Sequence, residues 1–173
     1  MLPSIETSHF ELKLSVLDYE LDSFGVINNA VYQNYLEHTR HQFLESQGLK
    51  LTAYFEQGLS PVITKAEIEY RSSLQSRDDF VVSLELALLS KVKFIFLLEI
   101  RSMPNKTLIL SARITGTILN SSGRPFLPAA FQGTDFSARR PPANLGRPSG
   151  YTEQDDHLTR QLLAHLNEGD QKN

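Results

Sequence analysis

The sequence of 173 residues contains no cysteine. The chain therefore forms no disulfide bond, and it has neither a thiolate metal ligand nor a cysteine nucleophile. The chain also has no large excess of positive or negative charge, since its formal net charge is −3 and its pI is about 5.9. This balance gives no broad electrostatic attraction to nucleic acid or to an anionic membrane. The chemistry of the chain must depend on oxygen and nitrogen groups.

Long hydrophobic runs are missing as well. The longest purely apolar run is residues 94–98, far short of the roughly 20 residues that span a bilayer. Residues 1–10 contain no apolar segment preceded by positive charge, so they do not resemble a secretory signal. We expect no membrane span and a cytoplasmic location, with a plastid as the alternative if a transit peptide precedes the sequence given.

The length and the hydrophobic content of 40% favour one domain with a single core. We place this domain at residues 1–135. Residues 136–173 differ in character, with a Pro- and Arg-rich segment at 139–148 followed by a helical pattern near 153–166. We interpret them as a C-terminal linker with an appended helix that serves no predicted chemistry.

The periodicity of the first part predicts a strand, a turn and a long helix. Residues 9–17 alternate between apolar and polar side chains, which is typical of a strand with one buried face. Residues 18–25 are polar and end in Gly25, which indicates a turn. From 29 to 47 apolar residues recur at helical spacing, and Gly48 follows as a C-cap.

A less ordered stretch is expected at 49–60, and the remaining pattern predicts four consecutive antiparallel strands. The breaks between these strands carry turn-forming residues. The strands are expected at residues 61–71, 79–89, 92–101 and 107–119. Together with the first strand they predict an α+β fold, in which an antiparallel five-stranded sheet packs on one long helix.

The best candidate for chemistry is the turn that leads into this helix. Asp22 lies in the turn, and Asn28 and Asn29 stand at the helix start, where either is a good N-cap. Unpaired N–H groups of a helix N-terminus can stabilise an oxyanion, while a carboxylate nearby can activate water or attack directly. An ordinary Asx-turn is the structural alternative for Asp22.

Charged residues in the middle of the helix form a second candidate group. Glu37 and His41 are four residues apart and share a face, so Glu37 could act as a second acid. A solvated or interfacial cluster that also includes Arg40 is favoured over this. Metal binding by His38 and His41 is not favoured, because the other histidines are distant in sequence and cysteine is absent.

Two lysines flank the connection near residue 91. Lys91 and Lys93 could contact the phosphates of a ligand, although edge lysines that prevent aggregation are the more common case. Several large apolar residues could line an acyl tunnel, but core packing is the default for each. They are Phe43, Phe55, Phe94, Phe96 and Leu98. A Gly-x-Ser-x-Gly elbow and a Gly-rich phosphate loop are both missing.

Three segments carry a family resemblance, namely residues 18–22, 25–32 and 40–46. Together with the strand order they resemble the hotdog-fold acyl thioesterases of the 4-hydroxybenzoyl-CoA thioesterase type over about residues 10–128. The likeness is greatest to small plant plastid acyl-carrier-protein thioesterases and related bacterial acyl-CoA thioesterases. It implies a sheet wrapped around the helix, and subunits that join their sheets edge to edge as a homodimer or homotetramer.

Carried over by position, Asp22 matches the catalytic aspartate of the family, and the backbone N–H near Asn29 matches the group that polarises the thioester carbonyl. Asn28 and Tyr32 would support that turn. The chain departs from common relatives at Val26, where a histidine often stands, and at Glu20, where an aspartate often stands. Neither difference removes the catalytic acid.

The resulting prediction is a hydrolase that releases a fatty or β-ketoacyl acid from coenzyme A or acyl carrier protein, without a cofactor or metal. Asp22 acts as nucleophile or general base, and the helix-start amides form the oxyanion hole. The predicted substrate contacts are Tyr32, Glu37, Arg40, Lys91 and Lys93. Two alternatives remain open: a thioesterase for aromatic acyl-CoA, such as hydroxybenzoyl or dihydroxynaphthoyl thioesters, and a non-catalytic module that binds acyl thioesters.

Overall fold

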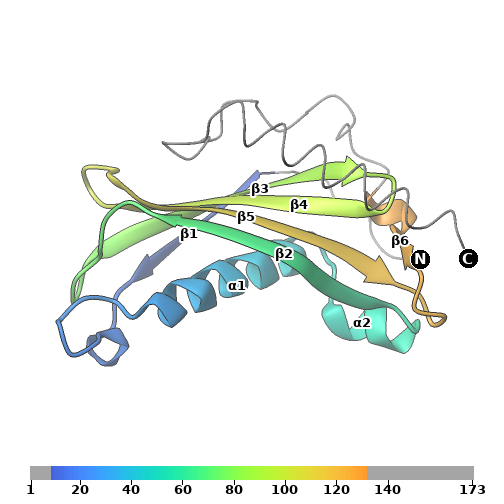
Figure 1. Cartoon of the computed structure of the whole chain (residues 1–173), viewed down its shortest axis with the longest axis horizontal. Coiled ribbons are helices and arrows are strands. Elements are labelled where there is room, and N and C mark those ends of the chain that lie inside the picture. Colours follow the sequence, from blue (N-terminus) through green and yellow to red (C-terminus); the bar gives the residue numbers. More distant parts are fainter. Residues whose placement is uncertain (1–8, 132–173) are drawn as a thin grey trace, which may run out of the picture. The chain divides into compact units, whose positions relative to one another are not determined.

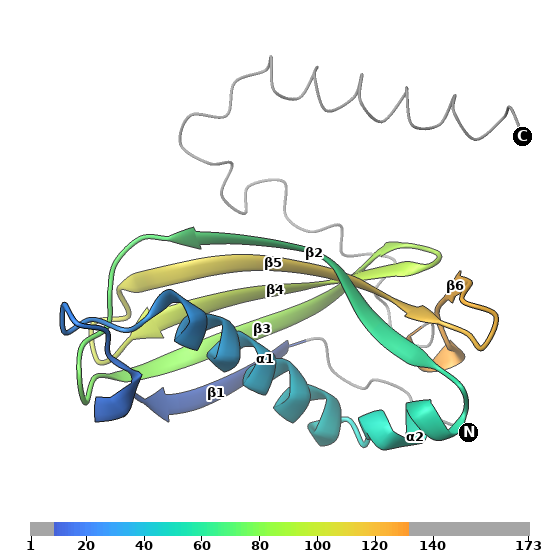
Figure 2. The ribbon, with the colours of Figure 1, turned by 60° about the horizontal axis from the view of Figure 1, so that its bottom comes forward.

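A curved antiparallel sheet with one long helix on its concave face makes up the structure (Figures 1 and 2). It is a computed structural model, and it describes residues 9–131. The strands are β1 (His9–Ser15), β2 (Ser60–Tyr70), β3 (Asp79–Ser90), β4 (Lys93–Ser102), β5 (Leu108–Leu119) and β6 (Pro125–Phe126). The α-helices are α1 (Asn29–Ser46) and α2 (Leu51–Glu56), and short 3-10 helices cover η1 (Asp18–Glu20) and η2 (Ala129–Phe131).

The strands follow the order β1-β3-β4-β5-β2, and β6 pairs with the end of β5. All of these pairings are antiparallel. β1 and β2 therefore form the two edges of the sheet, and within residues 9–131 no strand pairs with the outer edge of β2. The segment 16–59, which contains both α-helices, connects these two edges and passes across one face of the sheet (Figure 2).

The core lies between α1 and the sheet. Helix α1 buries one face, and aromatic rings on that face contact rings of the strands. The Phe43 ring lies 6.0 Å from that of Phe10 and 6.2 Å from that of Phe96, and the Tyr35 ring lies 4.8 Å from that of Phe80. Such pairs favour burial by their large apolar area and by edge-to-face geometry. They fix which face of α1 points to the sheet.

The predicted α+β class and the antiparallel sheet wrapped around one long helix are confirmed. The strand count differs, because the two-residue β6 adds a sixth strand to the predicted five. The stretch 49–60 is not irregular as predicted but contains α2, which is too short at six residues to give a helical period in the sequence. Other boundaries shift by no more than two residues.

Two predictions concern parts that these described residues do not test. The linker and helix predicted for 136–173 lie outside the described residues, as does the domain boundary at 135. Within residues 9–131, no helix has the length and apolar character that would let it cross a membrane.

Candidate functional site

The chain forms a small hairpin directly before α1. Leu21 and Ile27 make an antiparallel bridge, and between them the N–H of Asp22 donates to the Val26 carbonyl at 2.8 Å. Gly25 closes the turn with φ of +76°, a left-handed conformation that favours glycine. The hairpin places Asp22 beside Val26, and Val26 is three residues before Asn29, the first residue of α1.

The Asp22 side chain makes the hydrogen bonds of an Asx-turn with one of its oxygens. Oδ1 accepts from the N–H of Phe24 at 2.8 Å and from the N–H of Val26 at 3.3 Å. The side chain is half-buried. Oδ2 has no hydrogen-bond donor among the described residues. The turn thus orients the carboxylate with one oxygen and leaves the other available.

Asn28 caps α1. Its Oδ1 accepts from the N–H of Ala30 at 2.9 Å, and its carbonyl accepts from the N–H of Val31. Of the first helical residues, Asn29 is left with an N–H for which the described part of the chain offers no acceptor. A free N–H at a helix N-terminus is a donor for an oxyanion, and the helix dipole favours negative charge there.

Two buried tyrosines attach this region to the core. The Tyr35 hydroxyl donates to Glu20 Oε2 at 2.5 Å, and the same oxygen accepts from the N–H of Leu17 at 2.8 Å. Burial, followed by the Glu20 carboxylate, raises the pKa of Tyr35. The Tyr32 hydroxyl accepts from the N–H of Leu74 at 2.9 Å. Tyr32 thus lies in the core and joins α1 to the loop before β3, whereas its predicted contact with a substrate stays a prediction.

Asp18 links the same region to the loop before β3. Its carboxylate accepts a hydrogen bond from the Ser76 hydroxyl and lies 3.6 Å from the guanidinium of Arg77. These contacts, the hydrogen bond first, lower the pKa of Asp18. The loop before β3 is therefore linked to η1, just ahead of the Asp22 hairpin.

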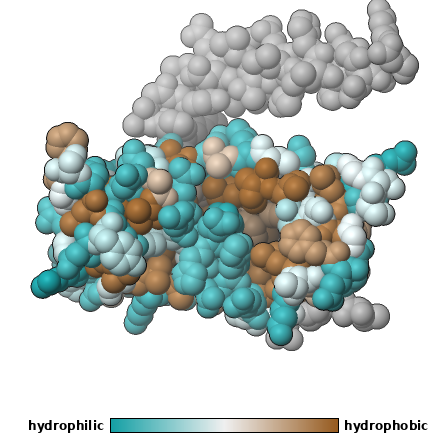
Figure 3. Space-filling view, turned by 90° about the horizontal axis from the view of Figure 1, so that it is seen from below, coloured by the Kyte–Doolittle hydropathy of each residue, from teal (hydrophilic) through white to brown (hydrophobic). Residues whose placement is uncertain are grey.

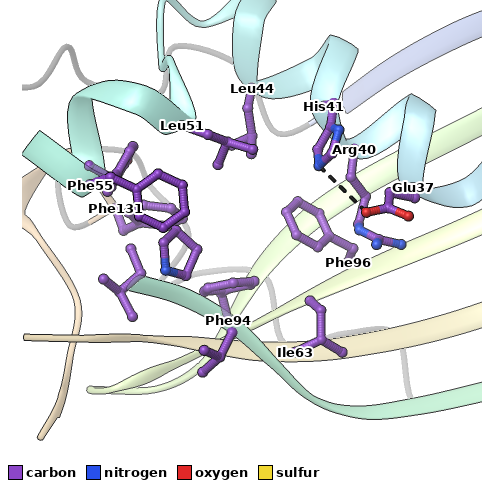
Figure 4. A pocket seen from close by; sticks show the side chains of 14 residues that line it. Glu37, Arg40, His41, Leu44, Leu51, Phe55, Ile63, Phe94, Phe96 and Phe131 are labelled. Carbon is purple, nitrogen blue, oxygen red and sulfur yellow. Dashed lines mark ion pairs between the residues drawn. The ribbon is translucent and has the colours of Figure 1, made fainter. Parts of the chain in front are cut away.

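An apolar cavity of about 180 Å³ lies between the second half of α1, α2 and the sheet (Figure 4). Phe94 and Phe96 of β4 and Ile63 of β2 contribute to one side, while Leu44 and Phe55 come from the two helices. Seen from the helix side, apolar surface gathers around a hollow toward the end where α2 lies (Figure 3). Of the five apolar residues considered for an acyl tunnel, Phe55, Phe94 and Phe96 line this cavity, whereas Phe43 and Leu98 fill the core.

Charged residues gather at one end of the cavity (Figure 4). His41 Nε2 lies 3.9 Å from Glu37 Oε1, as their spacing predicts. Arg40 is half-buried, and burial lowers its pKa. Within residues 9–131 its guanidinium has no hydrogen bond or ion pair with an acceptor. Glu37 and Arg40 therefore contact the cavity, and their role toward a substrate stays a prediction.

A groove continues from this charged end toward the start of α1. It lies between α1 and β2, is lined by Gln33 and Leu36 on the helix side and by Ala66 and Ile68 on the strand side, and shares Arg40 with the cavity. Because each helical residue advances the axis by about 1.5 Å, the distance along α1 from Asn29 is about 12 Å to Glu37, where the lining of the cavity begins, and about 22 Å to Leu44, where it ends. The groove thus extends from the charged end of the cavity to Gln33, four residues after Asn29.

Lys91 and Lys93 lie at the opposite end of the sheet from Asp22. Asp79, at the start of β3, pairs with Ser15 shortly before the Asp22 hairpin, whereas Ser90 ends β3 beside the lysines. A strand of this length spans roughly 40 Å. The two lysines and Asp22 of one protomer therefore do not form one compact site, and phosphate binding by the lysines stays a prediction.

No group of three or more potential metal ligands occurs among residues 9–131. Sequence reasoning missed Tyr54, which lines the cavity from α2. It was missed because α2 itself was not predicted.

Comparison with known proteins identifies the family. Residues 16–144 match the sequence model of the Thioesterase-like superfamily, so the chain belongs to that superfamily. This confirms the resemblance to hotdog-fold thioesterases.

The curated relatives include two chloroplastic proteins of Arabidopsis thaliana. The chain is 40% identical over 115 residues to the acyl-acyl carrier protein thioesterase ATL3, and 39% identical over 115 residues to ATL2. In each case the match covers 66% of this chain. It covers 60% of ATL3 and 61% of ATL2, so the chain spans about three fifths of the length of these relatives.

Solved structures share the fold. A 1,4-dihydroxy-2-naphthoyl-CoA thioesterase from Synechocystis superimposes with a TM-score of 0.68 at 19% identity, over 72% of this chain and 93% of that one. A Staphylococcus aureus protein solved in complex with CoA gives a TM-score of 0.65 at 18% identity, over 73% and 80% of the two chains. At these identities the likeness supports the fold alone.

Proposed function

We propose that the chain hydrolyses acyl thioesters at the hairpin that precedes α1. Two groups on either side of the hairpin carry this proposal. Asp22 Oδ2 is a carboxylate oxygen without a donor, and the N–H of Asn29 at the helix start has no acceptor among residues 9–131. The first is a base or nucleophile, and the second is an oxyanion donor. Membership of the thioesterase-like superfamily supports the same chemistry.

In the general-base route Asp22 takes a proton from water as the oxygen of the water attacks the thioester carbonyl carbon. The carbonyl oxygen becomes an oxyanion that accepts a hydrogen bond from the Asn29 N–H, and collapse of the tetrahedral intermediate breaks the C–S bond. The thiolate leaves and takes up the proton held by Asp22. In the nucleophilic route Asp22 itself attacks the carbonyl carbon, and the C–S bond breaks, so that the thiolate leaves and an anhydride forms between the acyl group and Asp22. Water then hydrolyses this anhydride, which releases the acid, restores the Asp22 carboxylate and supplies the proton that the thiolate takes up.

The groove and the cavity favour a fatty acyl group over an aromatic one. A thioester carbonyl at the start of α1 lies about 12–22 Å along the helix from the residues of α1 that line the cavity, a span that an extended acyl chain covers and a single aromatic ring does not. The connecting groove is lined partly by apolar residues such as Leu36 and Ile68. The Arabidopsis relatives are named as acyl-acyl carrier protein thioesterases, and the names of two structural neighbours mention CoA. We therefore propose both acyl carrier protein and coenzyme A as leaving thiols.

A second copy of the chain is proposed to cover β2. This edge strand is eleven residues long, and most of its side chains are exposed, including Ile63 and Tyr70. A long edge that carries apolar side chains is a template for pairing with another strand. Edge-to-edge pairing of two β2 strands would continue the sheet and close the adjoining groove, which gives the predicted homodimer. Relatives named as chloroplastic make a plastid the proposed location alongside the cytoplasm.

The test is release of free thiol from a panel of saturated, β-ketoacyl and aromatic thioesters, each on coenzyme A and on acyl carrier protein. Wild type and Asp22→Asn are compared side by side. We expect hydrolysis of fatty acyl or β-ketoacyl members and loss of that activity in the variant. Preference for the aromatic members would contradict the assigned acyl class. Tight binding of thioesters without thiol release by the wild type would identify a binding module and refute the hydrolase.

A further inference from the structure

Arg40 carries a positive charge for which the described part of the chain supplies no counter-ion. Its guanidinium makes no hydrogen bond and no ion pair within residues 9–131. The carboxylate of Glu37 is close enough to act on the charge of Arg40, but it lies beyond ion-pair distance from it and 3.9 Å from His41. An arginine stays protonated in proteins and presents five donors, so a half-buried guanidinium without a partner favours an anion.

The guanidinium is also open to a ligand. In the described part of the chain, buried side-chain nitrogens and oxygens without a partner occur only on Tyr54 and Arg113, so the unpaired nitrogens of Arg40 are not sealed in the core. Figure 4 shows the Arg40 side chain extending from α1 toward the sheet, at the charged end of the cavity. Arg40 lines both the cavity and the groove. A ligand at the junction of these two spaces can therefore contact it.

The space beyond Arg40 is apolar and limited in size. Away from the charged end, the cavity is lined by side chains such as Leu44, Phe94 and Phe131. Its volume is about 180 Å³, and an apolar cavity of about 150 Å³ holds benzene, which has about six carbon atoms. The cavity thus fits an alkyl tail of about six to eight carbons. On the helix side it opens as a hollow in the surface (Figure 3), through which a ligand can enter.

We propose that this end of the fold binds a medium-chain monocarboxylate, with the carboxylate on the Arg40 guanidinium and the alkyl tail in the cavity. A carboxylate matches a guanidinium because both are planar and can form two parallel hydrogen bonds. Burial among apolar side chains stabilises the tail. The site goes beyond the proposed hydrolysis, because the head group binds about 16 Å along α1 from Asn29 and no bond is broken.

A bound acid would compete with long acyl chains. Its tail occupies the space that the end of a long chain would enter from the groove, whereas a short acyl chain ends before that space. Medium-chain acids should therefore raise the KM for long-chain thioesters and leave the KM for short ones unchanged. This consequence rests on the proposed hydrolysis, whereas the binding itself does not.

A carboxylate from a second copy of the chain is the competing partner for Arg40, because the proposed pairing of β2 strands closes the adjoining groove. In that case the guanidinium is already paired in the dimer, and a free acid finds no charge to bind. Arg40→Gln would then weaken the dimer, as measured by light scattering, and would leave the binding of acids unchanged.

The experiment measures the Kd of straight-chain carboxylates from butanoate to dodecanoate by calorimetry, on the full chain at neutral pH, with octan-1-ol as the uncharged ligand. For the wild type we expect Kd to fall about fourfold per added methylene up to about octanoate and then to level off. Arg40→Gln should weaken octanoate about tenfold to 100-fold and leave octan-1-ol unchanged, and Arg40→Lys should restore part of the loss. Arg101→Gln is the matched control, since the guanidinium of Arg101 already pairs with Glu99 at 2.8 Å; it should leave both ligands unchanged.

Glu37→Gln gives a test of opposite sign. Removal of this negative charge near Arg40 should tighten octanoate about twofold to threefold, whereas general damage to the cavity would weaken it. If Arg40→Gln does not fold, the preference of the wild type for octanoate over octan-1-ol, and its increase in Glu37→Gln, decide the question.

Equal weakening of octanoate and octan-1-ol in Arg40→Gln would overturn the role of Arg40, and so would a weaker dimer with unchanged binding of acids. A wild type that binds no carboxylate refutes the site, even if it hydrolyses thioesters. The expected binding pattern supports the site even if no thioester is hydrolysed, so this inference and the proposed function fail separately.

Discussion

The two roles of Asp22, in the turn and in the chemistry, can be separated by a pair of substitutions. Oδ1 holds the turn through two backbone N–H groups, while the other oxygen and the negative charge serve the reaction. Asp22→Asn keeps a carbonyl oxygen in the Oδ1 position and removes the charge. Asp22→Ala removes both. The first variant therefore tests the chemistry alone, and the second tests chemistry and turn together.

The magnitudes follow from these bonds. The contact at 2.8 Å is a full hydrogen bond, whereas the contact at 3.3 Å is long and weaker, so their loss in Asp22→Ala should cost about 1–2 kcal/mol of unfolding free energy. That corresponds to a fall in Tm of roughly 2–8 °C for a chain of 173 residues. Asp22→Asn should stay within about 0.5 kcal/mol of the wild type. Both variants should lose about 100-fold or more in kcat, equal to about 2.7 kcal/mol or more of activation free energy.

The assay pairs thiol release with urea denaturation on each variant. Asp78→Asn is the matched control, because the Oδ2 atom of Asp78 accepts from the N–H of Gln75 at 2.8 Å in another turn and has no proposed part in the reaction. This control should keep both stability and turnover. If Asp22→Asn retains near-wild-type turnover, or loses it only together with its fold, Asp22 is an ordinary turn residue and the proposed mechanism is wrong.

The remaining predictions concern packing and pH. Gly116→Ala would bring a Cβ within 2.5 Å of the Phe94 ring, so we expect a loss of about 1–3 kcal/mol in urea denaturation; an unchanged midpoint would refute this close packing. Tyr32→Phe leaves the buried N–H of Leu74 without its acceptor and should cost about 1–3 kcal/mol, whereas a change in KM at unaltered stability would restore a substrate role. The pKa of Asp18 is lowered in the fold, so its contribution to stability is present above a pH of about 4 and is lost as pH falls further. The difference between the urea midpoints at neutral and acid pH should therefore be smaller in Asp18→Asn than in the wild type, and an unchanged difference would contradict the assignment.

The start of the helix illustrates how much local sequence decides. Asn28 caps α1 as a residue of its type at that position favours, and Gly25 takes the positive φ that the turn requires. The strand alternation also predicts the faces that are buried, because side-chain direction in a strand has a fixed period of two. These features depend on residues within a few positions of one another.

The roles of individual side chains depended on distant partners. Tyr32 was assigned to the substrate from its place in the motif, but its hydroxyl accepts from Leu74, 42 residues away. Lys91 and Lys93 are predicted substrate contacts because they flank a short connection and carry positive charge, and only the structure shows that the length of β3 separates them from the Asp22 hairpin of the same chain. No local pattern records such contacts, since they arise only when the strands have paired.

The sequence by itself determined the class of fold, the long capped helix and the carboxylate that precedes it, because these follow from periodicity, turn chemistry and capping within short segments. Only the tertiary structure decided that one oxygen of Asp22 is committed to the turn, and that a cavity opens between α1, α2 and β4. Cavities and unsatisfied groups are properties of packing between elements far apart in the chain, and such packing is fixed by the whole set of long-range contacts.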